Sequence, residues 1–248
     1  MTRATFKKKP IAREFAAHFH LLGCVDYEDC LSLQRRLAYD ALSRGDGRIA
    51  VLLCEHPPLI TIGRAGSRAN VRLTGADLAQ RRLAIRYVGR GGGAILHGPG
   101  QLALYPVVPL VWHRWTVGDY LRRLSLALHG ALSDLGLQAQ TPDGGYSLHG
   151  RGGVLAAVGV GVRHGVTSHG AFLGVHPDLR DYGRIEVAPG RKLSSVLSER
   201  QVPVKMAAVR AALVARLAAA LGCNRHHLHS GHPLLADLPA SDLRETAA

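Results

Sequence analysis

Apolar positions along the chain repeat with two different spacings, one typical of strands and the other of helices. Continuous apolar runs at 48–55 and 102–108 predict buried strands. Elsewhere apolar residues recur at every third or fourth position, which predicts helices over 26–44, 116–135 and 204–221. Because the two patterns alternate along one chain, the sequence predicts an α/β fold.

The shorter apolar stretches are bounded by glycine, proline or a polar cap. Asp26 is a residue type that begins helices, and Gly45 and Gly136 stand where two of the helices should end. Pro57 and Pro58 break the strand before them. The remaining pattern predicts strands at 18–25, 59–64 and 84–90, a short helix at 76–82, and a hairpin built from 154–165 and 166–179.

The glycine-rich stretch at 90–110 differs from the rest of the chain. Three successive glycines beginning at Gly91 allow backbone to lie against a ligand, and a Gly-Pro-Gly turn beginning at Gly98 reverses the chain. We interpret the stretch as a binding loop that feeds a strand; a plain connecting loop is the alternative. Its only strongly polar side chains, which are expected to have assigned partners, are Arg90, His97 and Gln101.

The chain of 248 residues has a formal net charge of +13 and a pI near 10.3. An excess of positive charge is typical of proteins that bind nucleic acid or an acidic protein partner. A genome that favours arginine codons would also produce it. Nucleic acid is disfavoured, because the basic residues are scattered and aromatic residues make up only 5% of the chain. No apolar run has membrane-spanning length and the N-terminus lacks a signal-peptide core, so we expect a cytoplasmic protein without membrane contact.

The four cysteines have no CxxC spacing and are expected to be reduced thiols, mostly in the core. The C-terminal histidines, at 226, 227, 229 and 232, fit no zinc pattern, so disorder is expected there and no metal site is predicted. The sequence predicts a basic lead-in at 1–17, a single domain at 18–222 and a histidine-containing tail at 223–248.

Several motifs, in this order, resemble the lipoyl/octanoyl transferase family. They are Glu55-His-Pro-Pro, Thr61-Ile-Gly-Arg, Arg90-Gly-Gly, His97-Gly-Pro-Gly-Gln with a strand reaching Tyr105-Pro, Ala157-Val-Gly, and Thr167 to Leu173. The resemblance implies a mixed sheet flanked by helices, the lipoate/biotin transferase-ligase (class II synthetase-like) fold. It also implies transfer of an octanoyl group from acyl carrier protein to a lysine of lipoyl domains, in a reaction that needs no cofactor. Acyl carrier proteins and lipoyl domains are both typically acidic.

The resemblance further implies an acyl pocket built from three segments. Small residues there would let an octanoyl or lipoyl chain lie along the sheet; tight packing of the sheet on a helix is the alternative reason for them. His97 is the leading polar candidate, as a hydrogen-bond donor near the thioester carbonyl, and a satisfied core histidine is the competing interpretation. The expected substrate-binding residues are Arg90, Gly91, Gly92, Gly93, Ala94, Ile95, Leu96, His97, Ala157, Val158, Gly159, Gly170, Ala171 and Phe172.

The residues that carry the family's chemistry have no counterpart in this sequence. The family uses a cysteine in a Pro-Cys-Gly turn as acyl acceptor, and a lysine ahead of Ala-Ala-Ile-Gly lowers its pKa. Alignment on the flanking residues places Val154 at the lysine and Pro189, or Ala188, at the cysteine. Lys192 and Ser194 are weak substitutes in the same loop.

Three functions are compatible with this loss, so whether the chain is an enzyme stays open. The first is an acyltransferase of lipoate metabolism in which the acceptor lysine attacks the thioester directly. The second is a non-catalytic binder of an acyl or lipoyl group, or of its carrier protein. The third, a basic nucleic-acid-binding module, is disfavoured. An ATP-dependent lipoate or biotin ligase would need a catalytic lysine and an adenylate-binding segment, and neither is evident.

Overall fold

The computed structural model describes residues 15–142, 144–180, 182–187, 190–223 and 225–236. The larger of its two sheets has the order β10 (Arg225–Ser230), β1 (Ala16–Cys24), β2 (Ile49–Glu55), β6 (Gln101–Val107), β9 (Val166–Gly174), β8 (Val154–Arg163) and β7 (Leu148–His149). The smaller sheet has the order β4 (Ala84–Tyr87), β3 (Leu59–Ile62) and β5 (Ala94–His97). Both sheets contain parallel and antiparallel pairs, so the predicted mixed sheet is confirmed.

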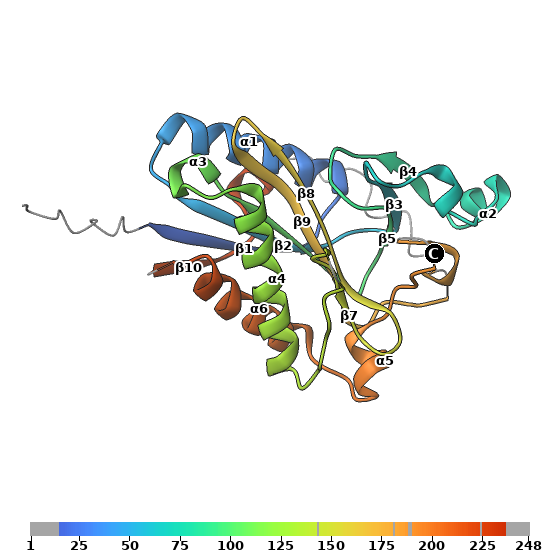
Figure 1. The fold of residues 1–248 in the computed structure, drawn as a ribbon. Coiled ribbons are helices and arrows are strands. Elements are labelled where there is room, and N and C mark those ends of the chain that lie inside the picture. The colour runs from blue at the N-terminus through green and yellow to red at the C-terminus, as the bar shows by residue number, and fades with distance from the viewer. Residues whose placement is uncertain (1–14, 143, 181, 188–189, 224, 237–248) are drawn as a thin grey trace, which may run out of the picture.

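Helices cover both faces of the larger sheet (Figure 1). On one face, α1 (Tyr27–Arg44) shares a hydrophobic cluster with residues of β2, β6 and β9. On the other face, α4 (Val117–Asp134) and α6 (Met206–Ala220) pack together over β1, β2 and β6. The predicted α/β architecture with flanking helices is therefore present. In the described part of the chain, every helix is too short or too polar to cross a membrane.

The long helices α1 and α4 both begin at a polar residue whose side chain caps the first turn. Asp26 precedes α1, and its carboxylate accepts hydrogen bonds from two backbone amides of the first turn. Gly45 ends this helix in the left-handed conformation. Thr116 caps α4 through reciprocal hydrogen bonds with Asp119. Short helical turns complete the fold: η1 (Arg68–Asn70), α2 (Gly75–Gln80), α3 (Leu110–His113), η2 (Tyr182–Arg184), α5 (Val196–Arg200) and α7 (Pro233–Ala236).

The predicted hairpin is confirmed, with β8 and β9 antiparallel and Gly159 opposite Gly170. A Cβ at Gly170 would lie 2.1 Å from the Leu104 carbonyl oxygen, so glycine is required where β9 lies against β6. The second strand ends at Gly174, earlier than the predicted 179. It ends there because the next two amides, of residues 175 and 176, turn to donate to the Gly100 carbonyl at 2.9 and 3.0 Å.

The binding loop is shorter than the sequence predicts. Ala94–His97 form β5, which pairs with β3 in antiparallel register, with Leu59 opposite His97. A strand of four residues between glycines is too short for its periodicity to be seen in the sequence. The loop is therefore confined to the glycines before β5, and the following residues belong to the smaller sheet.

The prediction of disorder for the C-terminal tail is wrong for 225–230. These residues form β10, which pairs in parallel with β1 from Ala16 to Leu21. The rings of His18 and His229 are stacked, 5.3 Å apart between centroids. Histidine does not count as apolar in a periodicity analysis, so this edge strand gives no signal in the sequence. The sheet thus begins inside the predicted lead-in and extends past residue 222, while residues 1–14 and 237–248 lie outside the described ones.

Candidate functional site

A cavity of about 360 Å³, called the acyl cavity below, opens between the glycine-rich loop, β8 and the segment around β7. All three segments that the sequence predicts for substrate binding reach it. The predicted residues that line it are Arg90, Gly92, Gly93, Ile95, Ala157, Val158, Gly159 and Phe172. The predicted residues outside its lining are Gly91, Ala94, Leu96, His97, Gly170 and Ala171. Residues that face one another across this space thus come from distant parts of the sequence.

The glycine-rich loop is held between two neighbouring backbones. On one side, the amides of residues 63–65 donate to carbonyls of residues 90–93 at 2.9 to 3.1 Å. On the other side, the Gly91 amide donates to the Val160 carbonyl of β8 at 2.9 Å. A Cβ at Gly159 would lie 2.4 Å from the Gly91 carbonyl oxygen, so a side chain there would push the loop away. The loop is therefore a fixed wall of the cavity.

Arg90 places a buried cation in that wall. Its guanidinium donates to the carbonyl and hydroxyl oxygens of Thr61, at 3.0 and 2.8 Å, and to the Gly91 carbonyl at 2.9 Å. The Nε has no hydrogen-bond partner among the described residues. Burial lowers the pKa of Arg90 to about 10, which leaves the side chain charged at neutral pH. A positive charge in the cavity wall favours a ligand with an electron-rich oxygen.

His97 lies behind the cavity wall and is fully buried. Its Nδ1 donates to Gln101 Oε1 at 3.0 Å, and its Nε2 accepts from the Thr61 hydroxyl at 2.8 Å. Burial lowers the pKa of His97 well below its ordinary value, in keeping with a neutral ring that both donates and accepts. The ring packs on Phe172, with centroids 4.6 Å apart. This geometry is that of a satisfied core histidine, which supports the cavity through Phe172.

His149, which no motif in the sequence marks, also lines the acyl cavity. It ends β7, where its backbone exchanges two hydrogen bonds of 2.8 Å with Gln140. The side chain also lines an adjoining cavity of about 480 Å³. Burial and, after it, the charge of Arg191 lower the pKa of His149. A lone histidine on a strand of two residues carries no pattern, so only the fold reveals an imidazole where the two cavities meet.

One end of the acyl cavity is where the family's reactive residues are expected. Val154 lines the cavity, and its amide donates to the Lys192 carbonyl at 2.8 Å. Ala188 and Pro189, the two predicted positions of the cysteine, lie outside the described residues. Val187 and Arg191, on either side of them, both line the cavity. The loop that should carry the cysteine therefore borders the cavity.

The two weak substitutes in this loop differ in their surroundings. Lys192 is exposed and lines the adjoining cavity, outside the acyl cavity. Ser194 is buried and lines neither of these cavities. Its hydroxyl donates to Glu199 Oε1 at 3.1 Å, and the same carboxylate accepts from the Arg151 and Gly152 amides. Ser194 thus belongs to a network that joins α5 to the 150–153 turn.

The ionisable groups in the described lining of the acyl cavity are two arginines and one imidazole: Arg90, Arg191 and His149. No carboxylate is present in that described lining. The rest of the lining is mainly backbone and apolar side chains, such as Ile95 and Phe172. The site therefore combines an apolar volume with positive charge, which suits an acyl chain that ends in a polarised carbonyl.

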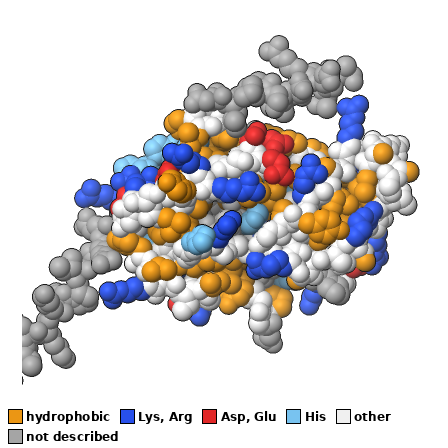
Figure 2. Space-filling view, turned by 90° about the horizontal axis from the view of Figure 1, so that it is seen from above, with side chains coloured by type: hydrophobic (Ala, Val, Ile, Leu, Met, Phe, Trp, Pro, Cys, Tyr) orange, Lys and Arg blue, Asp and Glu red, His pale blue; other side chains and the backbone are white. Residues whose placement is uncertain are grey.

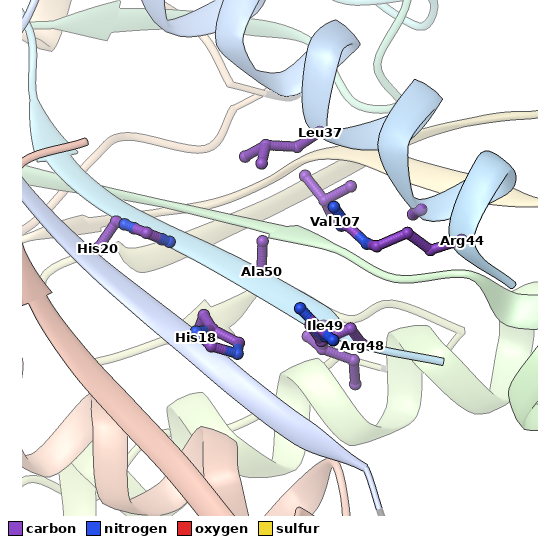
Figure 3. A pocket seen from close by; sticks show the side chains of 9 residues that line it. His18, His20, Leu37, Arg44, Arg48, Ile49, Ala50 and Val107 are labelled. Carbon is purple, nitrogen blue, oxygen red and sulfur yellow. The ribbon is translucent and has the colours of Figure 1, made fainter. Parts of the chain in front are cut away.

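Other hollows lie outside this site, and two of them are lined by residues of α1. A groove of about 720 Å³ lies between α1, the end of β4 and the β8–β9 hairpin, on the face seen in Figure 2, where basic side chains are spread among hydrophobic ones. A small cavity of about 160 Å³ lies between α1, β1 and β2, and Figure 3 shows its histidines, His18 and His20, with Arg44 and Arg48. Neither hollow shares a lining residue with the acyl cavity.

Comparison with known proteins agrees with the site. The chain matches the model of the lipoyl protein ligase A/B catalytic domain over residues 26–220. The octanoyltransferase of Geotalea uraniireducens is 36% identical over 197 residues, which cover 79% of this chain and 88% of that protein. The octanoyltransferase of Roseiflexus sp. is 32% identical over 226 residues, covering 89% and 94%. A bipartite lipoate protein ligase from Thermoplasma acidophilum has a TM-score of 0.65 at 18% identity, over 88% of each chain.

The structural likeness confirms the predicted fold of lipoate ligases and transferases. The matched residues 26–220 include every strand that lines the acyl cavity. The identity to the two octanoyltransferases extends over most of the same fold. This chain therefore belongs to the lipoyl protein ligase A/B family, within its octanoyltransferases.

Proposed function

We propose that this chain transfers an octanoyl group from acyl carrier protein to a lysine of a lipoyl domain. The observation that carries the proposal is the acyl cavity, in which three motif segments meet. Its volume of about 360 Å³ falls within the roughly 300–1,000 Å³ of small-ligand sites. Ile95, Val158 and Phe172 offer apolar surface to the alkyl chain.

The route of transfer follows from what the sequence contains. No cysteine lies between Cys54 and Cys223, so the described cavity has no thiol to hold the acyl group. We propose direct attack, in which the acceptor lysine nitrogen bonds the thioester carbonyl carbon and the carbon–sulfur bond then breaks. The amine loses a proton, and the leaving thiolate gains one, so the step needs no other reactant.

Two side chains of the cavity suit this step. His149 is neutral at physiological pH, because burial and Arg191 lower its pKa, and it can take the proton from the attacking amine and return it to the thiolate. The positive charge of Arg90 in the cavity wall can stabilise the carbonyl oxygen as negative charge develops there. Replacement of His149 by alanine should therefore lower the transfer rate without changing the affinity for octanoyl carrier protein.

The partners proposed for this reaction are the acyl carrier protein and the lipoyl domain. The net charge of +13 and the basic side chains on the groove face (Figure 2) favour acidic partners through long-range attraction. Association should then slow as salt rises, and association that is insensitive to salt would contradict this part of the proposal. We infer a cytoplasmic location, in keeping with four free cysteines.

The transfer reaction itself tests the proposal. Octanoyl carrier protein and an apo lipoyl domain are mixed with the chain, and octanoylation of the domain is followed by intact mass. We expect octanoylation well above the reaction without enzyme. A matched control, His226→Ala, removes an exposed histidine far from the cavity lining and should leave the rate unchanged.

A non-catalytic binder of the acyl group or its carrier is the second candidate function. The absence of the family's cysteine from the sequence favours it. It predicts measurable binding of octanoyl carrier protein without any octanoylation of the lipoyl domain. That result would replace the transferase proposal with the binder.

A further inference from the structure

A second group of reactive side chains lies beneath the acyl cavity and takes no part in the proposed transfer. Cys30 comes from α1, Cys54 from β2, and His56 follows that strand directly. All three are buried, with exposed fractions of 0%, 0% and 1%. Residues 54 and 56 are two apart along extended backbone, so their side chains lie on one face of the chain, toward α1.

The three ligand atoms lie at distances that suit one metal ion. The two sulfurs are 3.9 Å apart, and Cys54 Sγ lies 3.6 Å from His56 Nε2. All three atoms lie within 4.8 Å of one another. Tetrahedral zinc with bonds of about 2.3 Å to sulfur and about 2.0 Å to nitrogen requires sulfur–sulfur and sulfur–nitrogen spacings of about 3.8 and 3.5 Å.

The histidine is held in the tautomer that a metal needs. His56 Nδ1 lies 2.7 Å from the Val25 carbonyl oxygen, and because a carbonyl only accepts, Nδ1 carries the proton. Nε2 is therefore the acceptor nitrogen, and it faces the Cys54 thiol and the Tyr105 hydroxyl. A metal-binding histidine commonly donates its other ring N–H to a backbone carbonyl in this way.

A hydroxyl oxygen lies beside the histidine of this group. The Tyr105 hydroxyl lies 2.8 Å from His56 Nε2 and is fully buried. The distance between the Tyr105 oxygen and His56 Nε2 must increase by about 0.4 Å for both atoms to bind a tetrahedral ion. In the absence of an ion, the hydroxyl donates to Nε2.

We propose that Cys30, Cys54 and His56, with Tyr105 as the fourth donor, bind one structural zinc ion. Two thiolates balance the charge of Zn²⁺, and thiolate and imidazole are the donors that this ion prefers. The site has no opening to solvent, which is typical of structural zinc and excludes a role as the metal of a reaction. Because it is closed, the ion enters during folding.

The site would connect two parts of the fold that the acyl cavity depends on. It ties α1 to β2, and its Tyr105 packs edge-on against Phe172 of the cavity wall, with centroids 5.9 Å apart. His56 also contacts His97, which supports the same phenylalanine. Zinc here stabilises the wall without touching the substrate, so the inference does not depend on the proposed transfer.

The metal content of the full chain is the first test. Chain produced in zinc-supplemented medium and freed of loose metal should contain about one zinc ion per chain by inductively coupled plasma mass spectrometry. A Cys30→Ala/Cys54→Ala variant should lose it. The matched control is Cys24→Ala/Cys223→Ala, because these two thiols lie outside the group, and it should keep the zinc.

Cobalt then reports which atoms bind the metal. Wild-type chain refolded with Co²⁺ should show thiolate-to-cobalt charge-transfer absorption in the near ultraviolet and strong visible bands of a tetrahedral ion. The histidines of β1 and β10 can bind metal only through nitrogen. A His18→Ala/His229→Ala variant should therefore keep the charge-transfer band.

Three results would overturn the proposal. They are wild-type chain that holds no zinc after refolding with excess metal, zinc that persists after both cysteines are replaced, and bound cobalt without a thiolate band. The wild-type measurements decide the question even if the double cysteine variant does not fold, and circular dichroism shows whether it does.

Discussion

The apolar wall of the acyl cavity and its reactive end are built from different parts of the chain, and they differ in how closely they follow the family. The wall is formed by the glycine-rich loop, Ala157 to Gly159 and Phe172, whose motifs resemble those of the family. The reactive end, around Val154 and Arg191, lacks the expected cysteine and lysine. In the proposed reaction, the wall supplies the apolar surface and the Arg90 cation, and proton transfer is the task of His149.

Breaking the wall should have the largest effect. Gly159→Val places a branched side chain where even a Cβ would lie 2.4 Å from the Gly91 carbonyl oxygen. We expect the free energy of unfolding to fall by about 1–3 kcal/mol and binding of octanoyl carrier protein to be lost, because the loop must move. Thermal unfolding and binding titrations measure both. Gly98→Ala, where a Cβ meets nothing within 4 Å, is the control, and normal binding by Gly159→Val would contradict the fixed wall.

Removing the imidazole at the reactive end should affect the chemistry alone. His149→Ala is expected to lower the transfer rate by about 10²-fold or more, while the affinity for octanoyl carrier protein stays unchanged. Transfer assays and titrations on the same samples compare the two effects. An unchanged rate would remove His149 from the mechanism.

The same imidazole predicts a pH dependence. Its pKa lies below the ordinary 6.5, because of burial and Arg191, and only the neutral ring accepts a proton. Transfer by the wild-type chain should therefore fall as pH falls below 6.5 through the lowered pKa, and acyl binding should not follow. The residual transfer of His149→Ala should lack this dependence, and an identical profile in that variant would assign the titration to another group.

Replacing the loop hydroxyl should have a smaller effect, on stability rather than rate. Ser194→Ala removes the hydroxyl that donates to Glu199, so the free energy of unfolding should fall by about 1 kcal/mol. The transfer rate should stay near that of wild type, because Ser194 lines neither cavity. Denaturant titration and the transfer assay give the two values. A lower transfer rate without a loss of stability would indicate that Ser194 acts as the nucleophile in place of the family's cysteine.

Protonation of His20, near the far edge of the larger sheet, should have the smallest effect on the acyl cavity. Burial lowers the pKa of His20 to about 4 in the folded chain, against 6.5 for an exposed histidine. Between these values the unfolded chain binds a proton that the folded chain does not, so stability is lost as pH falls from 6.5 toward 4. His18, His229 and His232 add positive charge around it.

Hydrogen exchange of β10 measures this loss. Its amides should exchange faster at about pH 5 than at pH 7 after correction for the intrinsic rate, and His20→Gln should reduce the difference. Acyl binding should be the same in both chains at pH 7. Equal protection of β10 at the two pH values would contradict the role of the histidines.

The sequence predicts the elements that carry their own local signals. Asp26, Thr116 and Gly45 mark helix ends through their caps, and the Arg90-Gly-Gly and Ala157-Val-Gly motifs identify two of the segments that meet at the cavity. These signals lie in residue types whose backbone preferences or hydrogen bonds act over a few positions. For such elements, the structure adds detail rather than correction.

The missed features depend on partners distant in sequence. β10 is a strand because β1 pairs with it and its histidines stack on His18 and His20. His149 matters because the fold brings a two-residue strand beside the glycine-rich loop. Cys30 and Cys54 are far apart in the sequence, and their thiols meet only because α1 packs on β2. Spacing along the chain contains none of these contacts.

A single-turnover experiment that follows the masses of all three proteins tests the account most directly. Octanoyl carrier protein, this chain and an apo lipoyl domain are mixed, quenched at short times and analysed intact. Direct transfer predicts that the lipoyl domain gains the octanoyl mass while this chain never does. An octanoyl adduct on this chain that forms and decays on the path to product would contradict direct attack, and a lipoyl domain that stays unmodified would contradict transfer altogether.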